Sequence, residues 1–468
     1  EPTSDISVRL CKTGLMWSAQ DLDERDGSKT EQVAALVVRR IERGRLAVGS
    51  RLPSERDLAA RLGLSRVTVV RALDSLRARG VLTTKPSSGT VVSPADRLLD
   101  PIAPSDPTER TEGLLDLRFA TTAAPYEVVT ATQRVVRDHL RAAMTTDGSP
   151  PGGSQALRVA LAAQLTERGL PTLPSQLTLT VGAAAGLELL VNALDVGPGT
   201  ALTESPTYPG SLSLLRTRRL SVVGWPAGPG AWDPDQLAHL IHTARPKVVY
   251  LQVDNHNPTG ASLPAEHRSR VVELCRRAGA VLISDETMRP IWFDDGAQPA
   301  PLSRHRGVIS IGSFSKTVWG GLRVGWVRAP QHVTARLHAS PTAGIVTPSA
   351  IDELVALEIL GRMDDIVTRR CRILRTNLDS LHAGLRSLDQ VAWQPQTGGL
   401  TLWLELLHHR PRRVIEAARQ RGLLLAPIDA FTPDGQDTRH LRIPITAAPD
   451  HLRAALGILA ETLYGAAG

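Results

Sequence analysis

The sequence lacks the features of a disulfide-rich, metal-binding or membrane-spanning protein. Its three cysteines, Cys11, Cys275 and Cys371, are widely spaced and odd in number, which is typical of neither a disulfide framework nor a metal site. No apolar run reaches the roughly 18 residues of a membrane span, and no secretory leader pattern opens the sequence. We therefore expect inert thiols, no bound metal, no membrane contact and a reducing, cytoplasmic location.

Lysine is also scarce. Only five of the 54 basic residues are lysines. One of them, Lys316, follows two serines in the stretch SFSKTVWGGLR and lies seven residues before Arg323. Because the chain uses arginine wherever positive charge alone is needed, Lys316 is predicted to serve a purpose for which a guanidinium is unsuitable.

Positive charge is concentrated near the start of the chain. The net charge is +7, and residues 29–95 carry 13 Lys and Arg against 5 Asp and Glu, which leaves the rest close to neutral. The 468 residues also exceed one ordinary domain. A basic module on a near-neutral body favours contact with nucleic acid or another anionic surface. A solvated arginine-rich face is the alternative.

The basic module has the pattern of a small α+β domain. Apolar spacing predicts helices over residues 31–44, 52–63 and 64–80, with Ser54 and Ser65 as N-terminal caps. Residues 81–92 form two β-rich arms around Pro-Ser-Ser-Gly, which predicts a hairpin. Three helices and a hairpin wing indicate a winged helix-turn-helix.

A winged helix-turn-helix predicts double-stranded operator DNA as a partner. Ser65, Arg66 and Thr68 begin the second helix of the pair, the end that approaches base edges in the major groove. Arg71, Arg77, Arg79 and Lys85 are expected to contact phosphates. The remaining residues that we assign to DNA binding are Ser54, Arg56 and Ser88. A protein-docking winged helix is the alternative.

The stretch LPSERDLAARLGLSRVTVVRALDSL, followed by GTVV, resembles the DNA-binding domain of the GntR family of transcription regulators. We place this domain at residues 29–94, after an N-terminal arm of residues 1–28. Residues 95–115 are rich in Pro, Asp and Ser and lack periodicity, so we expect a linker there.

Beyond the linker, helical stretches alternate with short β-rich runs such as QLTLTVG, VVYLQV, AVLISDE and GVISIGS. This alternation predicts an α/β domain with a mostly parallel sheet covered by helices. Ligands of such sheets bind beyond the carboxyl ends of the strands. Polar side chains, and one turn with bare backbone N–H groups, follow several of these runs. Together they define a candidate site: Gly182, Ala183, Ala184, Tyr208, Asn257, Asp285, Ser313, Ser315, Lys316 and Arg323.

These side chains match the groups of pyridoxal 5′-phosphate. The amine of Lys316 can form a Schiff base with an aldehyde. Asp285 can oppose a protonated pyridine nitrogen, and Asn257 can donate to a phenolic oxygen. Arg323, with the serine hydroxyls and the bare N–H groups of the Gly182 turn, suits a phosphate. Tyr208 offers either ordinary packing or a flat face for the ring.

From about residue 116 onwards, the segments HNPTG, SDE, SFSK and GLRVGW resemble fold-type I pyridoxal 5′-phosphate-dependent aminotransferases. With the GntR-like head, the whole chain resembles the MocR family of regulators. The resemblance implies a large subdomain at about 155–335, a small α+β subdomain at 340–468, a Schiff base on Lys316 and a head-to-tail homodimer. It also implies that Arg442, in RHLRIPIT, binds the carboxylate of an effector; a surface strand arginine is the alternative.

Two positions depart from the aminotransferase pattern. The family places a tyrosine two or three residues after the aspartate, where this chain has Thr287 and Met288. The family's Tyr-Gly-Asp-Pro segment corresponds here to GSPPGG, which starts at Gly148 and contains no tyrosine. Loss of a donor to the ring oxygen should weaken proton transfer. We therefore expect at most weak transamination.

The main functional hypothesis is a transcription regulator that senses an amine or amino-acid effector through aldimine exchange at Lys316. The alternative is an aminotransferase or related enzyme with an accessory winged helix. A regulator that has lost the cofactor is a third possibility.

Overall fold

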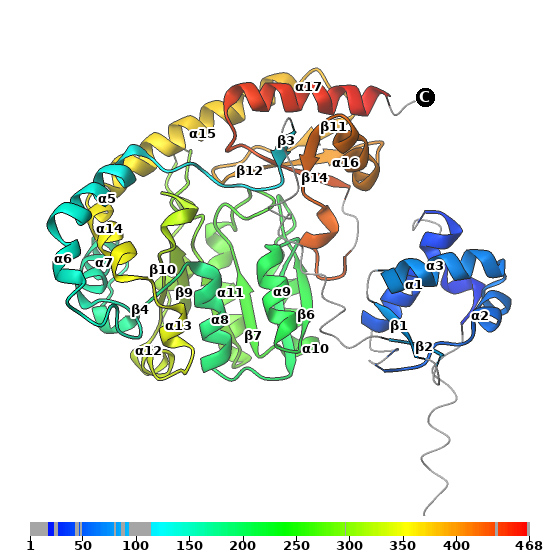
Figure 1. Ribbon diagram of the computed structural model, residues 1–468, viewed down its shortest axis with the longest axis horizontal. Coiled ribbons are helices and arrows are strands. Elements are labelled where there is room, and N and C mark those ends of the chain that lie inside the picture. Colours follow the sequence, from blue (N-terminus) through cyan, green and yellow to red (C-terminus); the bar gives the residue numbers. More distant parts are fainter. Residues whose placement is uncertain are drawn as a thin grey trace, which may run out of the picture. The chain divides into compact units, whose positions relative to one another are not determined.

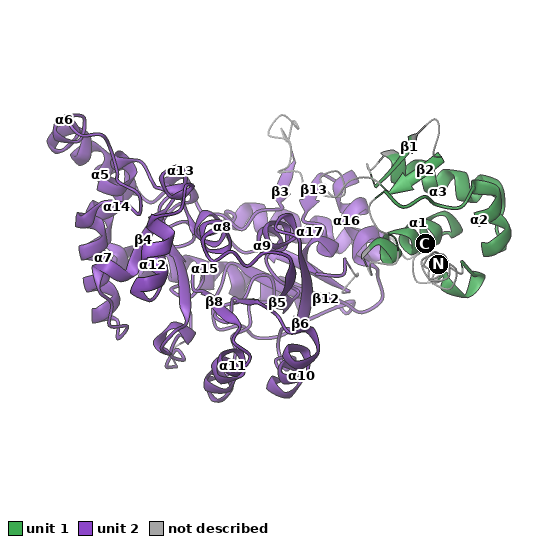
Figure 2. Cartoon of the chain, turned by 90° about the horizontal axis from the view of Figure 1, so that it is seen from below, with its two compact units in different colours: residues 1–109 green, residues 110–468 purple. Residues whose placement is uncertain are grey.

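The computed structural model describes residues 17–22, 27–42, 46, 49–78, 81–85, 89–92, 114–294, 296–435 and 439–465 (Figure 1). The chain divides into two compact units, residues 1–109 and 110–468 (Figure 2), which are treated separately below. Among the described helices, none is long and apolar enough to cross a membrane. The same residues contain no cluster of His, Cys, Asp and Glu arranged to hold a metal ion.

The first unit has the predicted winged-helix elements. They are α1 (Lys29–Glu42), α2 (Glu55–Leu62), α3 (Arg66–Ala78), β1 (Leu82–Lys85) and β2 (Gly89–Val92). A short 3-10 helix that was not predicted from the sequence, η1 (Ala19–Asp21), precedes them. The Ser54 hydroxyl accepts a hydrogen bond from the backbone N–H of Asp57 (3.1 Å), and Gly63 ends α2 with φ of 65°. Leucine and valine side chains of all three α-helices pack in one core. The two strands pair antiparallel, with Leu82 opposite Val92.

The large part of the second unit is a seven-stranded sheet with the order β4-β10-β9-β8-β7-β5-β6. The strands are β4 (Leu177–Thr180), β5 (Gly199–Ser205), β6 (Leu220–Pro226), β7 (Val248–Leu251), β8 (Val281–Asp285), β9 (Ile309–Ser313) and β10 (Gly325–Arg328). Only β10 runs antiparallel to its neighbours. The sheet is therefore mostly parallel, as the alternating pattern predicts.

Helices cover both faces of this sheet (Figure 1). Val248 and Tyr250 pack toward α8, whereas Val249 and Leu251 pack toward α10 and α11. Burial on both faces explains why β7 reads as a continuous apolar run instead of an alternating one. The helices around the sheet are α5 (Tyr126–Asp138), α6 (Leu140–Ala143), α7 (Gln155–Glu167), η3 (Pro174–Gln176), α8 (Ala183–Ala193), α9 (Pro209–Thr217), α10 (Pro234–Ala244), α11 (Ala265–Arg277), η4 (Leu302–Arg304), η5 (Gly320–Leu322), α12 (Gln331–His338), α13 (Ala343–Val346) and α14 (Ala350–Leu360).

The small subdomain is built on the antiparallel sheet β11-β12-β14 and on a parallel pair, β13 with β3. Its elements are β3 (Leu115–Leu117), α15 (Met363–Leu385), β11 (Val391–Trp393), β12 (Thr401–Leu406), α16 (Pro411–Gln420), β13 (Leu423–Leu425), η6 (Ile428–Phe431), β14 (His440–Pro444) and α17 (Pro449–Gly465). Packing differs from the expected boundaries in two places. Leu117 joins the small-subdomain core, while α13 and α14, beyond residue 340, pack against the large subdomain.

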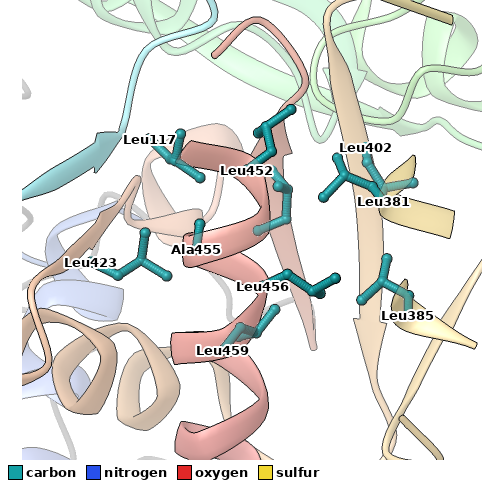
Figure 3. A pocket seen from close by; sticks show the side chains of 10 residues that line it. Leu117, Leu381, Leu385, Leu402, Leu423, Leu452, Ala455, Leu456 and Leu459 are labelled. Carbon is teal, nitrogen blue, oxygen red and sulfur yellow. The ribbon is translucent and has the colours of Figure 1, made fainter. Parts of the chain in front are cut away.

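The core of the small subdomain contains one small space between β12, α15 and α17 (Figure 3). Leucines point into it from all three elements, among them Leu402, Leu381 and Leu459. Its volume is about 10 Å³, barely enough for one water molecule, and apolar spaces of this kind stay dry. We therefore assign it to packing and look for function elsewhere.

Gly398 allows the two subdomains to approach closely. A Cβ atom at this position would overlap the carbonyl oxygen of Ile291 and the side-chain Oδ1 of Asn255. Asn255 is fully buried and donates to the carbonyl oxygens of Met288 (3.0 Å) and Ile291 (2.7 Å). Its side chain therefore cannot move aside without breaking these hydrogen bonds.

Gly398→Ala is expected to lower the free energy of unfolding by about 1–3 kcal/mol because the added methyl group must displace backbone. Urea denaturation followed by tryptophan fluorescence measures this change. The control is Gly457→Ala on the exposed side of α17, where the new Cβ meets no atom within 4 Å and helix propensity favours alanine. Equal stability of wild type and Gly398→Ala would contradict the prediction.

Candidate functional site

The carboxyl ends of the parallel strands bring the predicted site residues to one edge of the large sheet. Tyr208, Asn257 and Asp285 follow or end β5, β7 and β8. Lys316 follows β9, and Arg323 precedes the antiparallel strand β10, whose start lies at the same edge. Parallel pairing therefore gathers residues that are more than 100 positions apart in the sequence.

Gly182, Ser315 and Arg323 form a cradle suited to an anion. Gly182 caps α8 with φ of 107°, a conformation that favours glycine. A Cβ at Gly182 would lie 3.8 Å from Nη1 of Arg323 and 4.0 Å from Oγ of Ser315. Ser313 fixes this arrangement because its Oγ accepts from the Ser315 N–H (3.1 Å) and donates to the Ser315 hydroxyl (2.9 Å). Ala183 and Ala184 open α8, where first-turn N–H groups have no partner within the helix.

The amine of Lys316 is buried at this edge. Its Nζ donates to the carbonyl oxygen of Ala120 (3.2 Å). Burial, reinforced by the charge of Arg442 and opposed by that of Asp285, lowers the pKa of Lys316 to about 8. About a tenth of the amine is therefore uncharged at pH 7, far more than for an ordinary lysine, and this fraction can act as a nucleophile.

Asp285 is held by neutral donors instead of a cation. Its Oδ2 accepts from the hydroxyl of Tyr250 (2.5 Å), and its Oδ1 accepts from the N–H (3.0 Å) and hydroxyl (2.6 Å) of Thr287. Among the described residues, no Lys, Arg or His forms an ion pair with it. Hydrogen bonds from neutral groups therefore compensate for the burial of this carboxylate. Burial and the charge of Asp285 raise the pKa of Tyr250 well above its usual range.

Tyr250 is the functional residue that sequence reasoning missed. It sits inside the apolar run VVYL, where a tyrosine is expected to be core packing, and it is fully buried. A hydroxyl in the middle of a buried strand needs a hydrogen-bond partner. That requirement was the available signal, but the partner is 35 residues away.

Asn257 and Tyr208 complete the edge. The backbone N–H of Asn257 donates to Oε1 of Gln252 (2.8 Å), while its side-chain Oδ1 is buried without a partner among the described residues. Tyr208 keeps 39 % of its surface exposed. Burial and the charge of Asp285 raise the pKa of Tyr208, and the charges of Arg442 and Arg323 oppose that rise, so these side chains lie near one another.

Arg442 is a buried cation that faces the same site. Only 6 % of its surface is exposed. Its Nη1 donates to the carbonyl oxygen of Arg118 (3.0 Å), and its guanidinium lies over the ring of Phe431 at 5.3 Å. Burial lowers the pKa of Arg442 to about 10, and in the described part of the chain no carboxylate pairs with it. The alternative of a surface strand arginine is therefore wrong.

The two segments that depart from the aminotransferase pattern make contacts within the fold. Thr287 donates to Asp285, and Met288 is buried in the small-subdomain core. The segment from Gly148 to Gly153 lies beside β4 and α13, where Gly152 accepts from the Leu179 N–H and donates to the Thr347 hydroxyl. Neither segment supplies a tyrosine to the site.

The first unit presents an exposed surface at the start of α3. The Ser65 hydroxyl caps this helix by accepting from the Thr68 N–H (3.1 Å), and Arg66 has a side chain 71 % exposed. Arg56 and Arg71 are also exposed. The Ser54 hydroxyl is used as a cap. Arg79 and Ser88 lie outside the described residues, as does the side chain of Lys85.

Arg77, which we expected to contact phosphate, forms ion pairs and a hydrogen bond within the winged helix itself. It pairs with Glu55 (3.1 Å) and Asp74 (2.6 Å) and donates to the hydroxyl of Thr90 (2.9 Å). Those bonds tie α3 to α2 and to the wing.

Comparison with known proteins assigns both units. Residues 116–459 match the family described as aminotransferase class I and II, and residues 29–92 match the bacterial regulatory proteins of the gntR family. The chain is 30% identical to the HTH-type transcriptional regulator TauR of Rhodobacter capsulatus, over 81% of this chain and 84% of TauR. It is 29% identical to the HTH-type pyridoxine biosynthesis transcriptional regulator PdxR of Corynebacterium glutamicum, over 86% and 87% of the two chains.

Among solved structures, the fold resembles LysN, the α-aminoadipate aminotransferase of Thermus thermophilus, crystallised with N-(5′-phosphopyridoxyl)-L-leucine. The TM-score is 0.69, the identity is 24%, and the match covers 76% of this chain and 93% of LysN.

The lowered pKa of Lys316 predicts a specific dependence of stability on pH. The folded protein releases this proton near pH 8, whereas the unfolded chain keeps it to about pH 10.5. Stability of the cofactor-free protein, relative to Lys316→Met, should therefore rise between these values, by on the order of 3 kcal/mol at most. Urea denaturation of both proteins from pH 7 to pH 10 measures the difference, and a constant difference would contradict the prediction.

Proposed function

Because the chain belongs to the aminotransferase class I and II family and carries a gntR-family DNA-binding domain at residues 29–92, we propose that it is a MocR-type transcription regulator. It would bind pyridoxal 5′-phosphate and respond to an amine or amino acid. The observation that carries the proposal is that Lys316 lies within electrostatic range of Asp285, at the same edge of the large sheet, and of Arg442 in the small subdomain. The amine of Lys316 and the side chains of the other two are buried, and none is in an ion pair among the described residues.

The residues at this edge fit each polar group of the cofactor. The cradle of Gly182, Ser315 and Arg323, with the start of α8, would take the phosphate. Asp285 would face the ring nitrogen, and its unpaired negative charge supports that role. The side-chain amide N–H of Asn257 would donate to the ring oxygen. The side-chain oxygen of Asn257 has no partner among the described residues. Tyr208 would lie against the ring face.

When bound, the cofactor supplies an aldehyde that condenses with primary amines. Lys316 is the group to which it would be attached, since its buried amine is partly uncharged near neutral pH. An incoming amine would take the place of Lys316. The carbonyl oxygen of Ala120 would then remain as a partner for the released lysine amine.

Arg442 favours an effector that carries a carboxylate. Its charge acts on Lys316 and on Tyr208, so the guanidinium lies within range of both. A carboxylate on Arg442 would satisfy its unpartnered Nε, and an amine at Lys316 completes the description of an amino acid.

Regulation is favoured over catalysis. In place of the family's tyrosine, Thr287 uses its hydroxyl on Asp285 and Met288 is buried in the core, so neither is a donor to the ring oxygen. The matched relatives TauR and PdxR are described as transcriptional regulators. An aminotransferase with an accessory winged helix is therefore only the second candidate.

The protein would act as a head-to-tail dimer on operator DNA in the cytoplasm. Apolar side chains on one side of α5 support a further protein contact, because Tyr126, Val129 and Val136 are 74%, 47% and 55% exposed and lie three and seven residues apart. An effector would change DNA affinity by binding the two dimer states with different strength.

Lys316→Ala should abolish a visible absorbance band that wild-type protein acquires with pyridoxal 5′-phosphate, because the substitution removes the amine that forms the Schiff base. The matched control is Lys247→Ala, an exposed lysine of the same subdomain, which should retain the band. Amino acids that shift the band should also change operator affinity in wild type. Steady turnover of an amino donor and a keto acid would instead favour the enzyme.

Arg66→Ala should weaken operator binding by about 1–3 kcal/mol and relax sequence preference, since this exposed side chain begins the recognition helix. The control is Arg61→Ala at the end of α2. Binding is measured by fluorescence anisotropy against operator and scrambled duplexes at fixed salt. An unchanged preference for operator would show that α3 does not read the bases through Arg66.

A further inference from the structure

A cleft of about 390 Å³ lies in the second unit between loops of the large subdomain and the sheet of the small subdomain. This volume falls within the range of small-molecule sites. The large subdomain lines it with Pro206, Ala227, Gly228, Pro229, Ala231 and Thr259; the small subdomain contributes Ala392, Trp393, Gln394, Trp403, Glu405 and His440.

The small-subdomain wall is aromatic and carries one carboxylate. Trp403 stacks on His440 with ring centroids 4.7 Å apart and an angle of 11°. Trp393 also lines the cleft, but it pairs with Leu404 and stacks on His382 at 5.5 Å and 19°, so its ring lies on the core face of the sheet, opposite to that of Trp403. The stacked pair of Trp403 and His440 is therefore the aromatic surface that shares a sheet face with Glu405.

Glu405 gives the cleft its negative charge. It lies opposite His440 in the β12–β14 pair, and no Lys or Arg lines the cleft. Among the described residues, none forms an ion pair with Glu405. Aromatic faces together with an unneutralised carboxylate attract organic cations, above all those whose charge is spread over methyl groups or a ring.

The cleft is next to the cofactor site but is not part of it. None of the residues assigned to the cofactor or to the effector carboxylate lines it. Pro206 lies two residues before Tyr208, and Thr259 lies two residues after Asn257. Trp403 is paired directly with Arg442 across the small sheet, so the two sites share one sheet face.

We propose that this cleft is a second ligand site, which binds a small organic cation such as a quaternary or aromatic ammonium compound without covalent reaction. Because its walls come from both subdomains, a bound cation fixes their relative position. Arg442 lies on the same sheet face, so the cation also changes the affinity of the effector site for a carboxylate. Linkage makes the converse equally true.

Phenyltrimethylammonium tests the site by isothermal titration calorimetry on the full-length protein. It has no N–H and cannot condense with an aldehyde, so its binding is independent of the chemistry at Lys316. The neutral comparator is 2-phenyl-2-propanol, which has a similar shape. The cation should bind saturably and roughly tenfold more tightly than the alcohol.

Glu405→Gln should remove most of that preference, and Trp403→Leu should weaken the binding of both compounds. The control Glu461→Gln, on the exposed side of α17, should bind as wild type does. Lys316→Ala should also keep the cation site, which separates this proposal from the proposed function. Equal affinity for cation and alcohol, an unchanged Glu405→Gln, or loss of binding in Lys316→Ala would each overturn it.

Discussion

A buried carboxylate that neutral donors hold is the constraint on which the site depends. Tyr250 and Thr287 hold Asp285 with neutral hydrogen-bond donors, which leaves the carboxylate without an ion pair among the described residues. The charge of Asp285 acts on Lys316 and on Tyr208. Arg442, buried nearby, supplies the opposite charge and leaves the edge of the sheet complementary to a zwitterion.

The fold could be predicted well because its signals are local. Capping serines and Gly63 mark the helices of the head, and alternating helical and β-rich runs mark the parallel sheet. The site could be predicted in part for a related reason. Parallel strands end at the same edge, so polar residues after successive strands must meet there. This reasoning predicts that Lys316, Asp285, Asn257 and Arg323 lie at one edge of the sheet, and the structure has them there; their roles toward a ligand stay predictions.

Features that depend on pairing between distant segments could not be predicted from the sequence. Tyr250 looks like core until β8 places Asp285 against it. The assignment of β3 to the small subdomain depends on its pairing with β13, some 300 residues later, which no local pattern encodes. The aromatic cleft arises from the register of β12 and β14, where Trp403, Glu405 and His440 reach one face only because the strands pair as they do.

Helix α15 links the two subdomains of the second unit. Its first turns, with Met363 and Ile366, pack against the large subdomain, while Leu374 to Leu385 pack in the small one. The helix spans 23 residues without proline, and its one glycine, Gly384, is next to its end. Such a continuous rod resists sharp bending. Because one continuous helix is packed in both subdomains, a shift of the small subdomain would be carried to the large one through the first turns of α15, around Met363.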